Sequence, residues 1–222
     1  MIADQWESVF LAVGLGAART VPLTWLVPAL GGPRVAPEIR VGLGVLLAVL
    51  CLPILLPAVA AAPLATSAPS SLLGQGTVGW VLLVARELLV GLSVGLCTGA
   101  AFRAAEAAGR LVDILRGANM AEVLSPTSDE RTSPTGDLYL FIAVVLFLEM
   151  GGMRFLVAAL ARSYEAVPVG GAPSVAALGS VAALVTLTTA KLLESAVGLA
   201  APVLVALWIA DVALGVVGRA SP

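Results

Sequence analysis

Apolar residues run along the chain in five long stretches, separated by short segments rich in polar residues, glycine or proline. The stretches are Ser8 to Leu30, Val41 to Ala62, Val78 to Phe102, Leu138 to Leu160 and Val175 to Gly218. Each of the first four is close to the ~20 residues that a helix needs to cross ~30 Å of hydrocarbon. The pattern therefore predicts an all-α integral membrane protein in which each of these four segments crosses once.

Glycine and proline mark some of the boundaries between the stretches. Residues 31–37 predict a turn and residues 63–79 predict a loop, because both are rich in residues that break helices. The fifth stretch contains no turn signal, and as one helix it would be ~66 Å long, roughly twice the thickness of the bilayer core. We expect a single long helix, bent near Pro202, that needs other proteins to cover it.

Charged residues form a line at the centre of the chain. Arg103, Glu106, Arg110, Asp113 and Arg116 have a spacing of three or four residues, which places them on one face of a helix. The remaining positions are mainly alanine, glycine and branched apolar residues, which permit close helix packing. This pattern favours docking against a similar helix, and a solvated surface helix is the alternative.

Further charges fall inside or beside the apolar stretches: Arg19, Arg86, Glu87, Glu149, Arg154, Lys191, Glu194 and Asp211. One charge at the centre of a membrane helix costs ~2.5–3.5 kcal/mol on insertion scales. Lys191 and Glu194 have the spacing of a local ion pair, whereas Asp211 needs a partner from another helix or chain. We expect these residues to contact partner subunits or a water-filled path; the alternative is that they reach water at the membrane surface.

Composition narrows the functional classes. The chain of 222 residues is 59% hydrophobic and 12% charged, with a net charge of −2 and no histidine. A soluble domain usually has about 25% charged residues, and the net charge gives no sign of nucleic-acid binding. Without histidine, the triads, metal ligands and proton relays that use it are excluded. We expect no cofactor, no metal site and no enzymatic activity.

Neither the N-terminus nor the cysteines indicate secretion or redox chemistry. Asp4 and Glu7 stand where a secretory signal carries basic residues, so we expect the first apolar segment to remain in the mature protein. Cys51 and Cys97 lie in apolar runs and are predicted to be small buried hydrophobic residues.

Loop charges predict an orientation. With the N-terminus outside, loops 31–40, 103–137 and 219–222 face the cytoplasm, while the opposite loops contain only Arg162. The cytoplasmic group is Arg34, Arg40, Arg103, Arg110, Arg116, Arg131 and Arg219. This distribution fits the positive-inside rule.

Three ordered motifs carry a resemblance to a known family. They are R-T-V-P…P-A-L-G-G-P-R-V-A-P-E-I-R-V-G-L (19–43), R-G-A-x-x-A-E-x-x-x-P followed by E-R-T-S-P-T-G (116–136), and V-P-V-G-G (167–171). In this order the chain resembles the FliR/SctT family, the R/T subunit of the export apparatus in type III secretion systems. The residues of the central motif are more similar to those of the injectisome T branch than to those of the flagellar R branch.

The resemblance implies an assembly. Family members join P/R-type and Q/S-type subunits in a helical export gate for unfolded proteins, in the bacterial inner membrane and toward its periplasmic side, with a U-type switch subunit as a further partner. It implies a P-like region at 1–174 and a Q-like region at 175–222 that resembles the first helix of a hairpin. The second helix of the hairpin is expected to be missing, so the chain resembles a truncated member of the family.

These patterns together give a set of subunit-interface or gate candidates. The set is Arg103, Glu106, Arg110, Asp113, Arg116, Gly117, Glu122, Pro126, Ser133, Pro134, Gly136, Glu149, Arg154, Lys191, Glu194 and Asp211. The favoured function is a non-enzymatic component of a protein-export channel. A small secondary transporter or ion carrier is the alternative, since intramembrane charges suggest a polar pathway; an intramembrane enzyme is a third, and the common hydrolase and metalloprotease motifs are absent.

Overall fold

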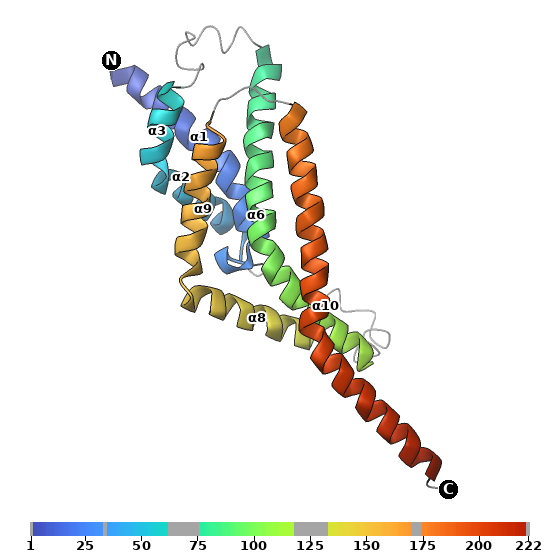
Figure 1. The fold of residues 1–222 in the computed structure, drawn as a ribbon. Coiled ribbons are helices and arrows are strands. Elements are labelled where there is room, and N and C mark those ends of the chain that lie inside the picture. The colour runs from blue at the N-terminus through green and yellow to red at the C-terminus, as the bar shows by residue number, and fades with distance from the viewer. Residues whose placement is uncertain (1, 33–34, 62–75, 118–132, 170–174, 221–222) are drawn as a thin grey trace. The chain divides into compact units, whose positions relative to one another are not determined.

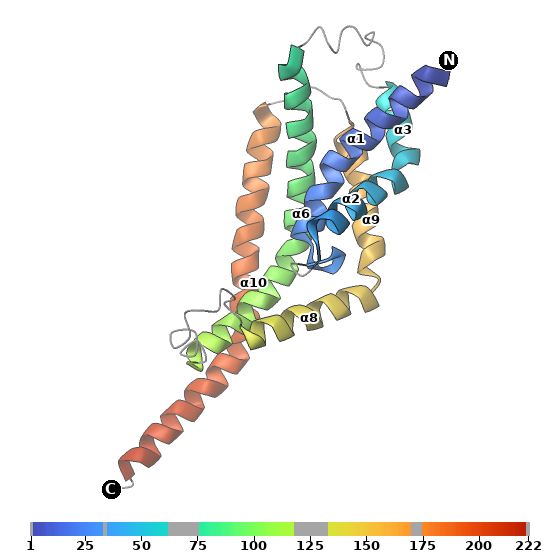
Figure 2. The same cartoon turned by 180° about the vertical axis from the view of Figure 1, so that it is seen from behind.

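A computed structural model describes residues 2–32, 35–61, 76–117, 133–169 and 175–220, and these residues contain helices and no strand. The helices are α1 (Ile2–Leu26), the 3-10 turn η1 (Pro28–Leu30), α2 (Pro37–Leu50), α3 (Leu52–Ala61), α6 (Gly76–Leu115), α8 (Pro134–Glu149), α9 (Gly152–Ala166) and α10 (Val175–Ala220) (Figure 1 and Figure 2). The prediction of an all-α membrane protein is confirmed.

Among the described residues, three helices are long and apolar enough to cross a membrane: Ser8–Leu26 within α1, Gly79–Leu115 within α6 and Gly179–Ala220 within α10. A fourth span is possible if α8 and α9 together form one broken span. The fifth apolar stretch is a single helix, as expected, and it continues through Pro202 without interruption. The bend near that proline stays a prediction.

Two of the predicted crossings are not continuous helices. The second stretch divides into α2 and α3 at Cys51, where Pro53 lies in the first turn of α3 and has no N–H to continue the bonding of α2. The fourth stretch divides at Gly151, whose φ of 74° lies in the left-handed region that glycine adopts readily. In contrast, the third stretch and the charged segment after it join without a break in α6.

The chain divides into two compact units, each built from separate segments. The first contains Met1–Gly99 and Phe147–Leu187, and the second contains Ala100–Leu146 and Thr188–Pro222. The predicted division into regions 1–174 and 175–222 stays a prediction.

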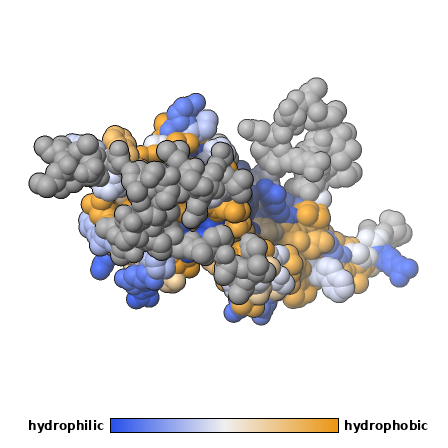
Figure 3. Space-filling model, turned by 90° about the horizontal axis from the view of Figure 1, so that it is seen from above, coloured by the Kyte–Doolittle hydropathy of each residue, from blue (hydrophilic) through white to orange (hydrophobic). Residues whose placement is uncertain are grey.

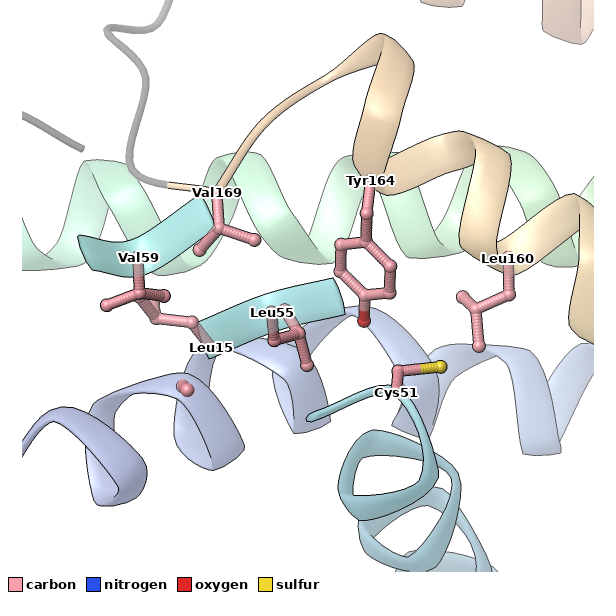
Figure 4. Close-up of a cluster of buried hydrophobic side chains, with 8 residues drawn as sticks. Leu15, Cys51, Leu55, Val59, Leu160, Tyr164 and Val169 are labelled. Carbon is pink, nitrogen blue, oxygen red and sulfur yellow. The ribbon is translucent and has the colours of Figure 1, made fainter. Parts of the chain in front are cut away.

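The core of the first unit lies between α1, α3 and α9. Leu15, Leu55, Leu160 and Tyr164 are buried together, and Figure 4 shows their side chains directed toward one another. Cys51 belongs to the same cluster, and burial raises the pKa of its thiol. This confirms the prediction for Cys51.

The prediction for the second cysteine is wrong. Cys97 is exposed, because it lies two positions from Gly95 and Gly99, whose face of α6 packs against α1, and a separation of two residues leads to the opposite side of a helix. The two cysteines of the described chain form no disulfide.

The second unit has a smaller core, formed by α6, α8 and the middle of α10. Ala108, Val112 and Ala200 are buried there, with Tyr139 and Leu204 packed against them. The small side chains allow close approach of the helix axes.

Much of the apolar surface remains uncovered by the chain itself. In the view of Figure 3, hydrophobic side chains reach the surface over much of the described chain. In the most apolar segment of 18 residues in α1, 44% of the residues are buried, whereas in the corresponding segment of α10 the share is 6%. Trp208 and Ile209 of α10 are 72% and 66% exposed. The apolar surface of α10 is therefore available to lipid or to other proteins.

Candidate functional site

The most buried charges of the described chain form an ion pair between two helices of the first unit. Arg19 of α1 donates from Nε to Oε2 of Glu87 in α6 at 2.9 Å, and neither side chain is exposed. The pair is closed off from solvent and lies in surroundings of low polarity. Each charge is compensated by the opposite charge of its partner. Such a pair withstands burial only when its remaining polar atoms also find partners.

Arg19 also reaches the end of α9. Its Nη1 donates to the carbonyl oxygen of Ser163 at 2.9 Å, and its Nη2 donates to the carbonyl oxygen of Val167, also at 2.9 Å. The guanidinium carbon lies 4.3 Å from the ring centroid of Tyr164, a cation–π distance. One side chain therefore joins three helical segments that are far apart in the sequence.

Arg86 extends this arrangement by one residue. Its Nη1 donates to Oε1 of Glu87 and to the carbonyl oxygen of Pro168, both at 3.1 Å. The two arginines thus contact three carbonyl oxygens at and just after the C-terminus of α9, where unpaired carbonyls and the negative end of the helix dipole favour cations. We call Arg19, Arg86, Glu87 and these carbonyls the arginine–glutamate cluster.

Three glycines of α6 make the approach of α1 to α6 possible. A Cβ on Gly91 of α6 would overlap the carbonyl group of Arg19, and a Cβ on Gly99 would lie 2.5 Å from the carbonyl oxygen of Leu26. Gly95 lies midway between these two glycines, and a Cβ there would lie 2.9 Å from Cδ1 of Leu26. The four-residue spacing of the glycines places them on one face, which sets the separation at which Arg19 and Glu87 meet.

The predicted charged face on α6 is present, and its charges pair within the helix. Glu106 accepts from Arg103 at 2.9 Å and from Arg110 at 2.6 Å, and Asp113 accepts from Arg116 at 3.3 Å. The carboxylates are buried while the three arginine side chains are about half exposed. The acidic groups thus serve the chain's own packing, and the guanidinium groups face outward.

Asp113 also caps the N-terminus of α8. Its Oδ2 accepts from Ser133 Oγ at 2.7 Å and from the backbone N–H of Thr135 at 3.0 Å, and its Oδ1 accepts from Thr135 Oγ1 at 2.5 Å. Ser133 Oγ in turn accepts from the backbone N–H of Gly136 at 3.1 Å, and Pro134 occupies the first helical position, where proline is favoured. Two backbone donors that a helix start leaves unpaired are satisfied in this way.

Two glycines bring these helices together. A Cβ on Gly109 of α6 would lie 2.5 Å from the carbonyl oxygen of Thr135, and a Cβ on Gly136 of α8 would lie 3.1 Å from that of Glu106. At the end of α6, Gly117 has a φ of 69° and its N–H donates to the carbonyl oxygen of Ile114. This left-handed residue ends the helix.

The structure does not bring the other predicted residues into these clusters. Glu122 and Pro126 lie outside the described residues. The side chains of Glu149, Arg154, Lys191, Glu194 and Asp211 are exposed. Within the described chain Lys191 and Glu194 form no ion pair, so the expectation of a local pair is wrong: both extend outward from a helix surface that no neighbour covers. Whether these residues contact partner subunits stays a prediction.

The arginine–glutamate cluster was missed as a site by sequence reasoning. Arg19 and Glu87 were recognised as charges in apolar stretches, but they are 68 positions apart, and nothing in the spacing indicates that they pair. The sequence offered one signal: two apolar segments carry opposite charges, and each charge alone disfavours insertion of its segment into the membrane. The described residues contain no group of three or more histidine, cysteine or acidic side chains that could hold a metal ion.

The fold and the buried ion pairs define a membrane protein whose long helices present more apolar surface than the chain itself covers. Comparison with known sequences then identifies its family: residues 10–222 match the bacterial export proteins, family 1, and the chain belongs to this family. The resemblance to the FliR/SctT family is confirmed.

Individual relatives show which branch is closer. The chain is 36% identical to Yop proteins translocation protein T of Yersinia pestis over 142 residues, which are 64% of this chain and 54% of that protein. It is 28% identical to surface presentation of antigens protein SpaR of Shigella flexneri over 100% of this chain and 80% of that protein. It is 26% identical to flagellar biosynthetic protein FliR of Pectobacterium carotovorum over 92% and 72%. The T branch therefore fits better than the flagellar branch; the chain spans about half the length of the Yersinia relative that it matches.

Proposed function

We propose that the chain is a non-enzymatic component of the export gate of a type III secretion system in the bacterial inner membrane. In this role it joins P/R-type and Q/S-type subunits, completes a helical ring, and helps to line a path for unfolded proteins. The driving energy comes from other components. The family, bacterial export proteins, and a relative named as a translocation protein support a role in protein export.

The observation that carries the proposal is the uncovered surface of α10. The apolar span Gly179–Ala220 has 42 residues and as a helix is ~63 Å long, about twice the hydrocarbon core. Lipid covers at most about half of such a helix. Since 6% of its most apolar segment of 18 residues is buried by the chain, the remaining surface needs other proteins.

The ion pairs within the chain support assembly over transport. Arg19 and Glu87 compensate each other and are closed off from solvent, which leaves neither free to carry an ion or proton along a path. Lys191 and Asp211, which a carrier would place around a central site, are exposed on α10. Their exposure suits contacts with neighbouring subunits.

A size series at one glycine of α10 tests the proposal. Gly198 is exposed, and a Cβ added there has nothing of this chain within 4 Å. Gly198→Leu therefore leaves the isolated chain folded, and replacing a helix-interior glycine stabilises the helix by up to about 1 kcal/mol. If sister subunits pack on α10, the same change reduces secretion in a strain that lacks its own R/T subunit.

Gly198→Ala is the matched control, since it adds the same backbone restriction with a much smaller side chain. We expect secretion to be highest in the wild type, lower in Gly198→Ala and lowest in Gly198→Leu, while the amount of chain in the membrane stays constant. Equal secretion by all three versions would contradict packing at this face.

A further inference from the structure

An arginine of the first unit is buried without a carboxylate partner. Arg40 of α2 is 9% exposed, and its Nε is buried with no hydrogen-bond partner. Within the described chain no ion pair includes Arg40. Its described contact is with an aromatic ring: the guanidinium carbon lies 4.9 Å from the ring centroid of Trp25. An uncompensated buried charge costs several kcal/mol, so the arrangement calls for an anion that the described residues do not supply.

The position of Trp25 shows at what depth in the membrane this anion would lie. Trp25 is the penultimate residue of the first candidate span, Ser8–Leu26. This span has 19 residues and a helical length of ~28 Å, close to the thickness of the hydrocarbon core. The indole and the guanidinium stacked on it therefore lie at the end of a span that matches the bilayer, where tryptophan and arginine meet the headgroups.

Exposed apolar side chains lie beside Arg40: Ile39 and Val41 of α2, and Trp25 of α1. Ile39 is 63% exposed and Val41 is 44% exposed, while Trp25 is 52% exposed. A single cationic group surrounded by exposed apolar side chains matches the two parts of a phospholipid, a phosphate next to acyl chains. Glu38 is exposed at the start of the helix and forms no ion pair with Arg40 within the described chain, so the cationic charge is available.

We propose that Arg40 and Trp25 form a binding site for the headgroup of an anionic phospholipid. The guanidinium binds phosphate oxygens through its two Nη groups, which can form paired hydrogen bonds, and the indole holds the guanidinium in place. The anionic leaflet supplies the negative charge that the described chain does not provide at this position. This site is separate from the arginine–glutamate cluster, in which Arg19 and Arg86 both contact Glu87.

Thermal unfolding of the purified chain in neutral detergent tests the site. Phosphatidylglycerol is added in one arm, phosphatidylcholine in the second and inorganic phosphate in the third. A ligand that binds the folded state raises the Tm in proportion to the logarithm of its concentration above Kd. We expect phosphatidylglycerol to raise the Tm by several degrees, and the other two additions to leave it nearly unchanged.

Variants distinguish this site from general attraction to an anionic surface. Arg40→Gln abolishes the shift caused by phosphatidylglycerol, whereas the control Arg162→Gln, which removes an exposed arginine of α9, keeps it. Without lipid, Arg40→Gln does not lower the Tm, because it removes an uncompensated charge. This keeps the test independent of a folding defect.

Three results would overturn the proposal. The first is a shift of equal size in Arg40→Gln and in the wild type, which would mean that the lipid acts elsewhere. The second is a full shift with inorganic phosphate alone, which would identify a free anion as the ligand. The third is the absence of a shift with phosphatidylglycerol, together with a stabilisation by co-purified gate subunits that depends on Arg40, which would assign the anion to another protein.

Discussion

Arg19 of α1 and Glu87 of α6 form an ion pair with no exposed side-chain surface, although 68 positions separate them in the chain. The pair joins the first and third apolar stretches, and through Ser163 and Val167 it also holds the end of α9. Each apolar segment alone carries a charge that disfavours insertion. The cluster therefore couples the packing of three segments to the pairing of Arg19 with Glu87.

Removing one partner of this pair leaves the other charge buried and uncompensated. We expect Arg19→Met and Glu87→Met each to destabilise the chain by about 3–5 kcal/mol, seen as a lower Tm of the detergent-purified protein or as loss of membrane-integrated protein. The double variant is expected to recover much of this loss, because neither fully buried charge remains; Arg86, which is partly exposed, keeps its bond to the carbonyl oxygen of Pro168. Arg162→Met, at an exposed position, changes the Tm little. Additive losses in the double variant would contradict the pairing.

Close packing of α1 against α6 depends on a residue without a side chain. Gly91→Ala places a methyl group against the carbonyl group of Arg19, and we expect it to lower the stability by the amount typical of overpacking, about 1–3 kcal/mol, measured as a lower Tm. Gly14→Ala is the matched control: it also lies within a helix, but nothing of this chain lies within 4 Å of the added Cβ. That control is expected to be neutral or stabilising by up to about 1 kcal/mol. Identical effects of the two changes would argue against the approach of these helices.

The contact of Asp113 with the start of α8 gives a local prediction. Asp113→Ala removes acceptors from Ser133 and from the N–H and hydroxyl of Thr135, and loss of such a cap costs about 0.5–2 kcal/mol. Hydrogen exchange at residues 135–137 is expected to become faster. Arg116→Gln, which removes a half-exposed partner of the same carboxylate, is expected to change exchange much less. Similar acceleration by both variants would indicate that the ion pair, and not the cap, holds this helix start.

The role of the turn at the end of α6 can be tested with a secretion assay. Gly117 has a φ of 69°, and a residue with a Cβ pays about 1–2 kcal/mol in this region. We expect Gly117→Trp and Arg116→Ala to reduce secretion in a complemented deletion strain more than Asp4→Ala does. Secretion at the wild-type level by all three would contradict a role for this turn in assembly.

Sequence reasoning predicted the features that depend on local spacing. The charged face from Arg103 to Arg116 needs only the helical repeat. The single helix over residues 175–220 followed from the absence of turn signals. Each of these rests on residues that are close in the sequence.

The features that were missed depend on tertiary contacts or on weak local signals. The break at Cys51 had a signal in Pro53, and the break at Gly151 had one in two consecutive glycines, but long apolar runs favoured continuous crossings. The pairing of Arg19 with Glu87 has no local signal, because it arises from the packing of α1, α6 and α9. The exposure of Arg103, Arg110 and Arg116, with their acidic partners buried, likewise depends on where α8 packs.

We propose that the apolar surface left uncovered by this chain, above all on α10, is covered by sister subunits. The mass of the particle purified from membranes after co-expression with P/R-type and Q/S-type subunits tests this covering. We expect one stable complex that contains the chain together with both kinds of subunit, and loss of that complex in Gly198→Leu. A chain that purifies by itself as a stable monomer, with its partners present in the same membranes, would contradict the proposed assembly.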